Sequence, residues 1–173
     1  MRTGERSESS DRAGHASRDC FSKDSKRVLA ILVLLYLDEV ACPYFYPLEM
    51  RGGSPMLPLG ESWTGVCRAN PDRPERPDDA ALKQCCNLGY ARRSCPRFPP
   101  GDGPDAVRFT VSSHEGDTLH IYYVVERDHR PAAHGPLECS VSTGRWTPAP
   151  GDHTLQRQAW AYVESYLRRT KER

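Results

Sequence analysis

Residues 107–126 read VRFTVSSHEGDTLHIYYVVE, and this stretch decides the fold. Apolar side chains alternate with polar ones at Val107, Phe109 and Val111, which is the period of a half-buried β-strand. A second strand-like stretch, 118–126, follows the turn sequence His-Glu-Gly-Asp. Two strands joined by so short a turn form an antiparallel hairpin. The pattern therefore predicts a β-hairpin over residues 107–126.

The sequence after the hairpin predicts one more strand and a helix. Residues 137–142 form a third strand-like stretch, after a loop that contains Arg130-Pro131 and Gly135-Pro136. Asp152 is a suitable N-cap for a helix over about 153–170. Apolar side chains recur there at helical spacing, and Arg168, Arg169 and Lys171 suit the helix dipole. The apolar positions are Leu155, Ala159, Tyr162, Val163, Tyr166 and Leu167.

Length and composition limit the architecture to one domain. A chain of 173 residues is long enough for one core, which we place in residues 28–173. The expected fold class is α+β: an irregular Cys-rich segment over 41–103, an antiparallel meander of about three strands over 105–142, and a C-terminal amphipathic helix. The formal net charge is only +1, so no global field directs the protein to nucleic acid or to an anionic membrane.

The first 37 residues contain a polar leader and a short apolar run. Residues 1–27 hold too little apolar surface to offset their ordering entropy, so we expect a disordered tail or an over-extended gene start. Residues 28–37 read VLAILVLLYL, which is shorter than the roughly 20 residues of a membrane-spanning helix. We expect a buried helix or strand here. The alternative is a secretory or lipoprotein signal, against which stand the charged leader and Asp38-Glu39.

Five of the seven cysteines fall within the segment 41–103, which has many turn residues and little periodicity. The only regular element we expect there is a short helix over 78–86. A loop of this length inside a compact domain is uncommon unless something else holds it. Thiolate bonds to a metal can replace a missing hydrophobic core as the source of folding energy. The segment is therefore a candidate metal site.

The spacing of the cysteines favours an iron–sulfur cluster over a zinc ion. Four of them form the pattern Cys42-x24-Cys67-x18-Cys86-x8-Cys95, with Cys85 as an alternative ligand. Four thiolates suit both a 4Fe-4S cluster and a structural zinc ion. Zinc sites commonly use C-x2-C pairs, which are absent, and Cys42 and Cys95 are each followed by proline, as is the last ligand in bacterial ferredoxins. The predicted cofactor is a 4Fe-4S cluster, with zinc as the alternative.

Two other hypotheses explain the cysteines without a metal. One is a non-enzymatic binding module whose cysteines form disulfides or stay as free thiols. Disulfides form in oxidising compartments, so the disulfide-bonded module would be exported. The other is an enzyme that uses the thiol of Cys85 or Cys86, and it is the weakest because no base to activate the thiol is identifiable. The cluster hypothesis places the protein in a reducing cytoplasm, with a redox protein as a candidate partner; the module would be exported or lipid-anchored. Cys20 and Cys139 lie outside all these schemes.

The remaining polar residues indicate no catalytic site. No hydrolase, zinc-protease or nucleotide-binding signature is present, so we expect no catalytic residues. His129 and His134 flank a stretch that we interpret as a solvated hairpin loop. Arginines interleave with Tyr90 and Phe98 over 90–98, as in a nucleic-acid-binding patch, but nearby acidic residues can cancel this charge. Nucleic acid is therefore not an expected partner. Trp63, Trp146 and Trp160 are assigned to core or rim packing.

Overall fold

The structure is a computed structural model that describes residues 40–52 and 57–172. All of these residues belong to one compact unit of the chain. The predicted tail over 1–27 and the apolar run over 28–37 lie outside the described residues. Among the helices of the described part of the chain, none is long and apolar enough to cross a membrane.

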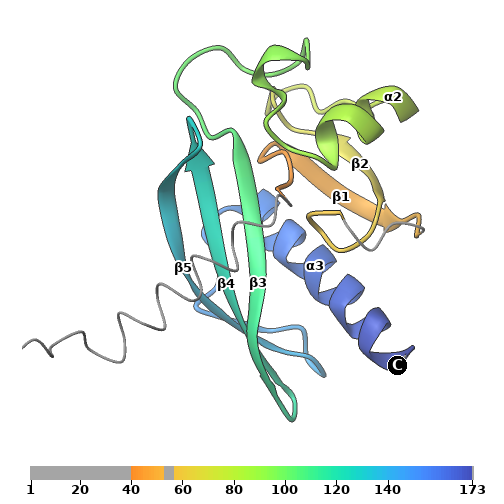
Figure 1. Cartoon of the computed structure of the whole chain (residues 1–173), viewed down its shortest axis with the longest axis vertical. Helices are drawn as coiled ribbons and strands as arrows, with labels where there is room; N and C mark the ends of the chain where they lie inside the picture. Colours follow the sequence, from red (N-terminus) through yellow and green to blue (C-terminus); the bar gives the residue numbers. More distant parts are fainter. Residues whose placement is uncertain (1–39, 53–56, 173) are drawn as a thin grey trace, which may run out of the picture. The chain divides into compact units, whose positions relative to one another are not determined.

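The predicted hairpin is confirmed, and it forms two neighbouring strands of a larger sheet (Figure 1). The strands β3 (Ala106–Glu115), β4 (Thr118–Arg127), β5 (Arg130–Ser140) and β6 (Trp146–Thr147) form one sheet in the order β3-β4-β5-β6. Neighbouring strands are antiparallel throughout, so the sheet is a meander. The α+β class predicted from the sequence is therefore correct, with one strand more than expected.

The third strand begins seven residues earlier than residue 137, so the prediction of a loop over 130–136 is wrong. Asp128 and His129 have φ angles of 49° and 59°, and two left-handed residues make the tight turn that returns the chain antiparallel to β4. Pro131 and Pro136 lie within the strand. They are tolerated because β5 pairs with β6 only at Glu138 and Cys139, which leaves its outer edge free of ladder bonds at the prolines.

The helix α3 (His153–Lys171) covers one face of this sheet, as predicted. The Asp152 carboxylate accepts hydrogen bonds from the N–H groups of Thr154 and Leu155, at 2.6 and 2.8 Å, so its role as N-cap is confirmed. Phe109 stacks on Tyr162, and Trp146 meets Trp160 edge to face. The buried residues shared by the sheet and α3 are Val107, Phe109, Leu119, Ile121, Leu137, Cys139, Ala159, Ala161 and Val163.

The Cys-rich segment contains more regular structure than the sequence indicates. The strands β1 (Phe45–Met50) and β2 (Trp63–Cys67) form a separate two-stranded antiparallel sheet. The short helix expected over 78–86 is present as α2 (Asp79–Ala81), continued by the π-helical turn η1 (Leu82–Cys86). A turn of 3-10 helix, η2 (Ala91–Arg93), follows. Pro47 in β1 and Gly65 in β2 are residue types that are rare inside strands. The sequence pattern therefore does not predict these two strands.

The small sheet is tied to the rest of the unit by buried polar bonds. Gln158 on α3 is only 1% exposed, and its side-chain amide donates to the carbonyl oxygens of Cys42 and Phe45, at 2.7 and 2.8 Å. Ala41 forms a backbone bridge with Val107 on β3. These bonds fix the chain on either side of Cys42, and so they position the first cysteine of the candidate site.

Candidate cysteine cluster

Five cysteines from four separate parts of the chain line one cavity. Cys42 precedes β1, Cys67 ends β2, Cys85 and Cys86 lie in η1, and Cys95 follows η2. The structure therefore brings together all four cysteines of the predicted constellation and the alternative Cys85. The cavity is small, with a volume of about 10 Å³, and its other lining residues are Tyr44, Phe45, Ala69, Arg97 and Phe98.

The backbone holds three of these cysteines through direct hydrogen bonds. The N–H of Cys42 donates to the carbonyl of Cys86 at 3.1 Å, which joins the start of the small sheet to η1. Cys67 exchanges two backbone hydrogen bonds with Glu75, at 2.7 and 3.1 Å. In the register of the small sheet, Cys67 lies opposite Phe45, three residues after Cys42. The first two cysteines are thus brought near each other by strand pairing.

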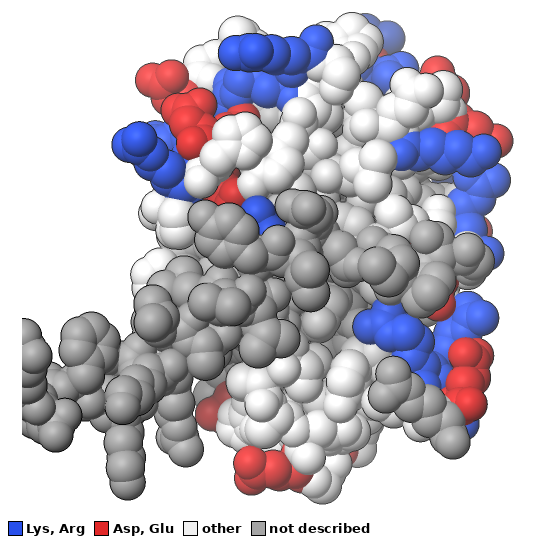
Figure 2. Space-filling view, viewed as in Figure 1, with Lys and Arg blue, Asp and Glu red and all other residues white. Residues whose placement is uncertain are grey.

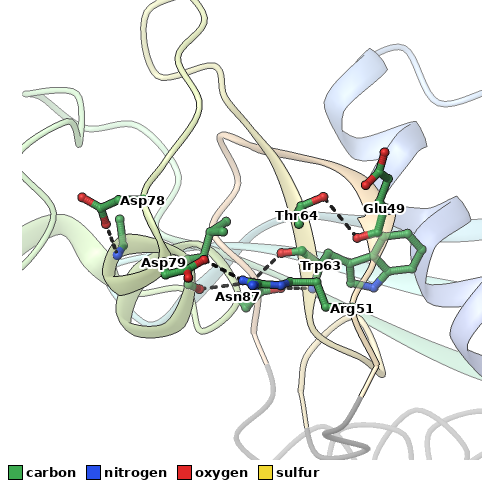
Figure 3. A network of polar contacts seen from close by, with 9 residues as sticks. Glu49, Arg51, Trp63, Thr64, Asp78, Asp79 and Asn87 are labelled. Atoms are coloured by element: carbon green, nitrogen blue, oxygen red, sulfur yellow. Dashed lines mark hydrogen bonds and ion pairs between the residues drawn. The ribbon is translucent and has the colours of Figure 1, made fainter.

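The η1 turn is anchored to β2 by Asn87 (Figure 3). The side-chain oxygen of Asn87 accepts from the N–H of Trp63, and its amide donates to the carbonyls of Trp63 and Leu82, at distances of 3.0 to 3.1 Å. Asn87 is 2% exposed, so these bonds form out of water. The N–H of Asn87 also donates to Leu82, five residues back, which is the wide turn of a π-helix. This turn presents Cys85 and Cys86 to the cavity.

The helix before the η1 turn is fixed from its surface side. The carboxylate of Asp78 accepts from the N–H of Ala81 at 2.8 Å and so caps the first turn. The next carboxylate, on Asp79, pairs with the guanidinium of Arg51 at 2.8 Å, which links α2 to the chain after β1 (Figure 3). Both contacts are exposed, so each adds little stability. Their effect is to orient η1 relative to the small sheet.

The thiols differ in their access to water. Cys42, Cys85 and Cys86 are 7%, 6% and 5% exposed, whereas Cys67 and Cys95 are partly exposed. Water therefore reaches the cavity more readily at Cys67 and Cys95 than at Cys42 and the η1 turn. All six cysteines in the described part of the chain are free thiols, so no disulfide staples this segment there.

Burial and mutual proximity make the thiols hard to ionise. Burial raises the pKa of Cys42 to about 12; the N–H of Tyr44 lowers it, and the nearby thiols of Cys67, Cys95 and Cys85 raise it further. Burial also raises the pKa of Cys86, and the neighbouring thiols act in the same direction. Without a counter-charge, such a cluster stays protonated. A bound cation would reverse this balance because thiolates are the form that ligates metals.

One cationic side chain lines the cavity and also forms an ion pair at the protein surface. Arg97 lines the cavity, and its guanidinium pairs with Glu75 at 3.1 Å. The cavity lining also includes the rings of Tyr44 and Phe98, which meet edge to face with their centroids 5.2 Å apart. The site therefore combines sulfur donors, an aromatic wall and one positive charge, which is paired with the Glu75 carboxylate.

Two of the three arginines in the 90–98 stretch, Arg92 and Arg97, pair with acidic side chains. Arg92 pairs with Asp105 and also donates to the carbonyls of Gly101 and Gly103. Asp105 is thus one of the nearby acidic residues that offset the charge of this stretch. Acidic and basic side chains are interspersed on the face that Figure 2 shows, without a broad area of one sign.

The other polar residues singled out in the sequence lie away from the cavity. His134 is on β5 and its Nδ1 contacts the hydroxyl of Tyr122 at 2.5 Å, so its assignment to a loop is corrected. His129 occupies the tight turn before β5 and stacks on Tyr90 at 4.3 Å. Cys139 is a buried core residue of β5, and Cys20 lies outside the described residues. Trp63 is 1% exposed, in agreement with its assignment to the core.

A single metal ion has no preformed site in this arrangement. Among residues 40–52 and 57–172, no three His, Cys, Asp or Glu side chains form a group that could hold a metal ion. Searches among family models, curated proteins and solved structures gave no match to this chain.

Proposed function

We propose that this protein holds a 4Fe-4S cluster through Cys42, Cys67, Cys86 and Cys95, for electron transfer, sensing or stabilisation of the fold. The observation that carries the proposal is the convergence of these four thiols on one cavity from four separate parts of the chain. Free buried cysteines in a structural core have no reason to gather in this way. Cys139, which is also buried, lines no part of the cavity.

The choice of a cluster over a single zinc ion depends on how far apart the ligand sulfurs must lie. Four sulfurs bound to one zinc at 2.3 Å lie about 3.8 Å apart, and no group in the described residues is arranged to hold one ion. In a cubane cluster each thiolate binds a different iron, so the ligand sulfurs lie further apart around a larger centre.

Charge balance gives the second line of support. Four thiolates and an oxidised 4Fe-4S core together carry net negative charge, so the site needs positive groups and backbone N–H donors. The Arg97 guanidinium at the cavity and the N–H of Tyr44 beside the Cys42 sulfur supply one of each. In the cytoplasm such a centre would exchange electrons with a redox protein, and the partly exposed Cys67 and Cys95 mark the side on which that exchange would occur.

The test is reconstitution of the full chain under anaerobic conditions with ferrous iron, sulfide and a thiol reductant. The expected result is a brown protein with a broad absorbance near roughly 400 nm and about four irons per chain. Cys→Ser changes at 42, 67, 86 and 95 should each abolish this absorbance. Cys139→Ala is the matched control, because it removes an equally buried thiol that is not at the cavity. Wild-type protein that binds zinc but no iron would overturn the proposal.

A further inference from the structure

A second cavity, of about 610 Å³, adjoins the cysteine cavity and shares Tyr44 and Ala69 with it. It lies where the β3–β4 hairpin meets the N-terminal end of α3, with Val107, Val125 and Leu155 in its lining. Small-molecule sites have volumes of roughly 300–1,000 Å³, so this cavity is large enough for an organic ligand. The proposed cluster makes no use of it.

The wall of this cavity is largely apolar and is built on rigid parts of the backbone. Val107 and Val125 are register partners in the β3–β4 pair, so their side chains lie next to each other on one face of the sheet. Pro43, Pro71 and Pro104 also line the cavity, and each proline ring fixes one backbone torsion. A preformed wall of this kind can bury the apolar body of a ligand with little ordering of the protein.

Gln158 contributes a buried polar side chain to the lining. Its Nε2 donates to the carbonyls of Cys42 and Phe45, which fixes the orientation of the whole amide group, and its Oε1 accepts no hydrogen bond from the described residues. The fully covered side-chain atoms without a partner in that part of the chain are Glu61 Oε2 and Trp63 Nε1, so Gln158 Oε1 keeps access to the cavity. Buried amide oxygens are nearly always hydrogen-bonded, so this atom suits a donor on a ligand.

Arg68 supplies a positive charge at the same cavity. Its N–H donates to the carbonyl of Tyr44 at 2.8 Å, which fixes its backbone beside the cavity. Its guanidinium lies over the ring of Tyr46, 3.9 Å from the centroid, and pairs with no carboxylate in the part of the chain that the structure describes. A guanidinium held on an aromatic face keeps its N–H donors free for a planar carboxylate.

The charges around the cavity favour a ligand with a single negative charge. Arg68 is the one permanently charged cation of the lining. The Asp152 carboxylate also lines the cavity, where its Oδ1 accepts from the N–H groups of Thr154 and Leu155. Asp152 would repel a doubly charged phosphate, which one arginine cannot balance. A monocarboxylate that turns away from Asp152 and toward Arg68 meets no such excess of negative charge.

We infer that this cavity binds a small organic acid with an apolar body, whose carboxylate pairs with Arg68 and whose second polar group, a donor such as a hydroxyl, bonds to Gln158 Oε1. The apolar body lies against Val107 and Val125. The inference does not rest on the proposed cluster, because no cysteine lines this cavity. Acid binding by a chain that takes up no iron would leave this inference standing, and a chain that binds the cluster but no acid would leave the proposed function standing.

The test is a nuclear magnetic resonance titration of the isotope-labelled full chain, kept reduced and without added iron. The probes are the para-hydroxylated acids hydroxyphenylacetate and hydroxyphenylpropionate, which differ in length by one methylene. We expect at least one of them to cause saturable shifts in the backbone amides of Ala69, Val107 and Leu155, and none in that of Gly116, in the turn between β3 and β4. Titrations without saturation for both acids, or saturable shifts only at other amides, would overturn the inference.

Changes to the ligand test each contact without altering the protein. The carboxamide of the bound acid has nearly the same shape but no charge, and it should bind about tenfold more weakly, because hydrogen bonds between charged groups are the stronger kind. The same acid without its hydroxyl group should bind at least about threefold more weakly. Equal affinities of acid and carboxamide would contradict the role of Arg68. Equal affinities with and without the hydroxyl would contradict the role of Gln158.

Matched arginine variants test the ion pair from the side of the protein. Arg68→Gln should weaken binding of the acid about tenfold and leave the affinity for the carboxamide nearly unchanged. Arg76→Gln is the control, because Arg76 is exposed and does not line the cavity. Losses of equal size for acid and carboxamide in Arg68→Gln would contradict the ion pair. The amide spectrum shows whether each variant is folded, and the ligand series decides the matter if Arg68→Gln is not.

Discussion

Replacement of Gln158 by leucine tests how α3 holds the first cysteine. Gln158 is buried, and its amide donates to the carbonyls of Cys42 and Phe45, so Gln158→Leu removes two buried hydrogen bonds. The two side chains are similar in size and in helix propensity. The carbonyl of Cys42 keeps a second hydrogen bond, from the N–H of Phe45 at 3.0 Å, which limits the loss.

The expected cost is about 1–3 kcal/mol, because each buried hydrogen bond contributes about 0.5–1.5 kcal/mol net. With a urea dependence of about 2 kcal/mol per molar, the unfolding midpoint should fall by about 0.5–1.5 M. The control is Gln156→Leu, two residues earlier on the same helix, where the side chain is partly exposed. That variant should stay within about 0.5 kcal/mol of the wild type.

The assay is urea unfolding of both variants, followed by circular dichroism at the wavelength of the helix signal. Equal midpoints for Gln158→Leu and Gln156→Leu would refute the assignment of Gln158 as the link between α3 and the Cys42 segment. A second expectation follows from the proposed function: Gln158→Leu should also bind the cluster less tightly than Gln156→Leu, since it loosens one ligand.

Three further changes test the elements around the cavity. Gly89→Ala should lower the thermal unfolding temperature clearly more than Gly116→Ala. Both glycines have left-handed φ angles, but only a Cβ at Gly89 would lie 2.7 Å from the carbonyl oxygen of Val40. Equal decreases in the two variants would contradict this packing. Asp152→Ala should lose about 1 kcal/mol of stability by removing the N-cap of α3, and Asp152→Asn should lose little; a loss of equal size in both would exclude the capping role. Burial alone would raise the pKa of Asp105, but hydrogen bonds from the N–H of Asp128 and from Arg92 lower this pKa below 3.8. The ionised carboxylate therefore contributes stability above pH 3.8, and this contribution is lost as the pH falls through the lowered pKa. The difference in unfolding free energy between wild type and Asp105→Asn, measured by urea unfolding from pH 7 downward, should shrink in that acid range, and a constant difference would contradict the assignment.

The large sheet and its helix could be predicted from the sequence because they obey simple periods. The apolar residues alternate at Val107, Phe109 and Val111, and they recur at helical spacing after Asp152. Each pattern places apolar side chains on one face, as a half-buried strand and an amphipathic helix both require. The beginning of β5 could not be predicted in this way. Its prolines lie on an edge that makes no ladder bonds, a fact that depends on the short length of β6 and not on the local sequence.

The candidate site was predictable in its composition and not in its geometry. The clustering of cysteines between 42 and 95 points to a shared site, but their approach depends on the pairing of β1 with β2 and on the Asn87 bonds to Trp63. Such long-range pairing leaves no periodic trace in strands this short. For the same reason, the sequence offers Cys85 as an alternative ligand without indicating its surroundings, whereas the structure places the Cys85 sulfur 3.9 Å from the hydroxyl of Ser94.

Native mass spectrometry of the full chain, purified and kept without oxygen, tests the central claim most directly, because it weighs the bound group in the intact protein. We expect the chain to carry the added mass of four irons and four sulfides, and to lose all of it in Cys86→Ser but not in Cys139→Ala. A bare chain, after purification and again after supply of iron and sulfide, would contradict the assignment of the cysteine cavity as a cluster site.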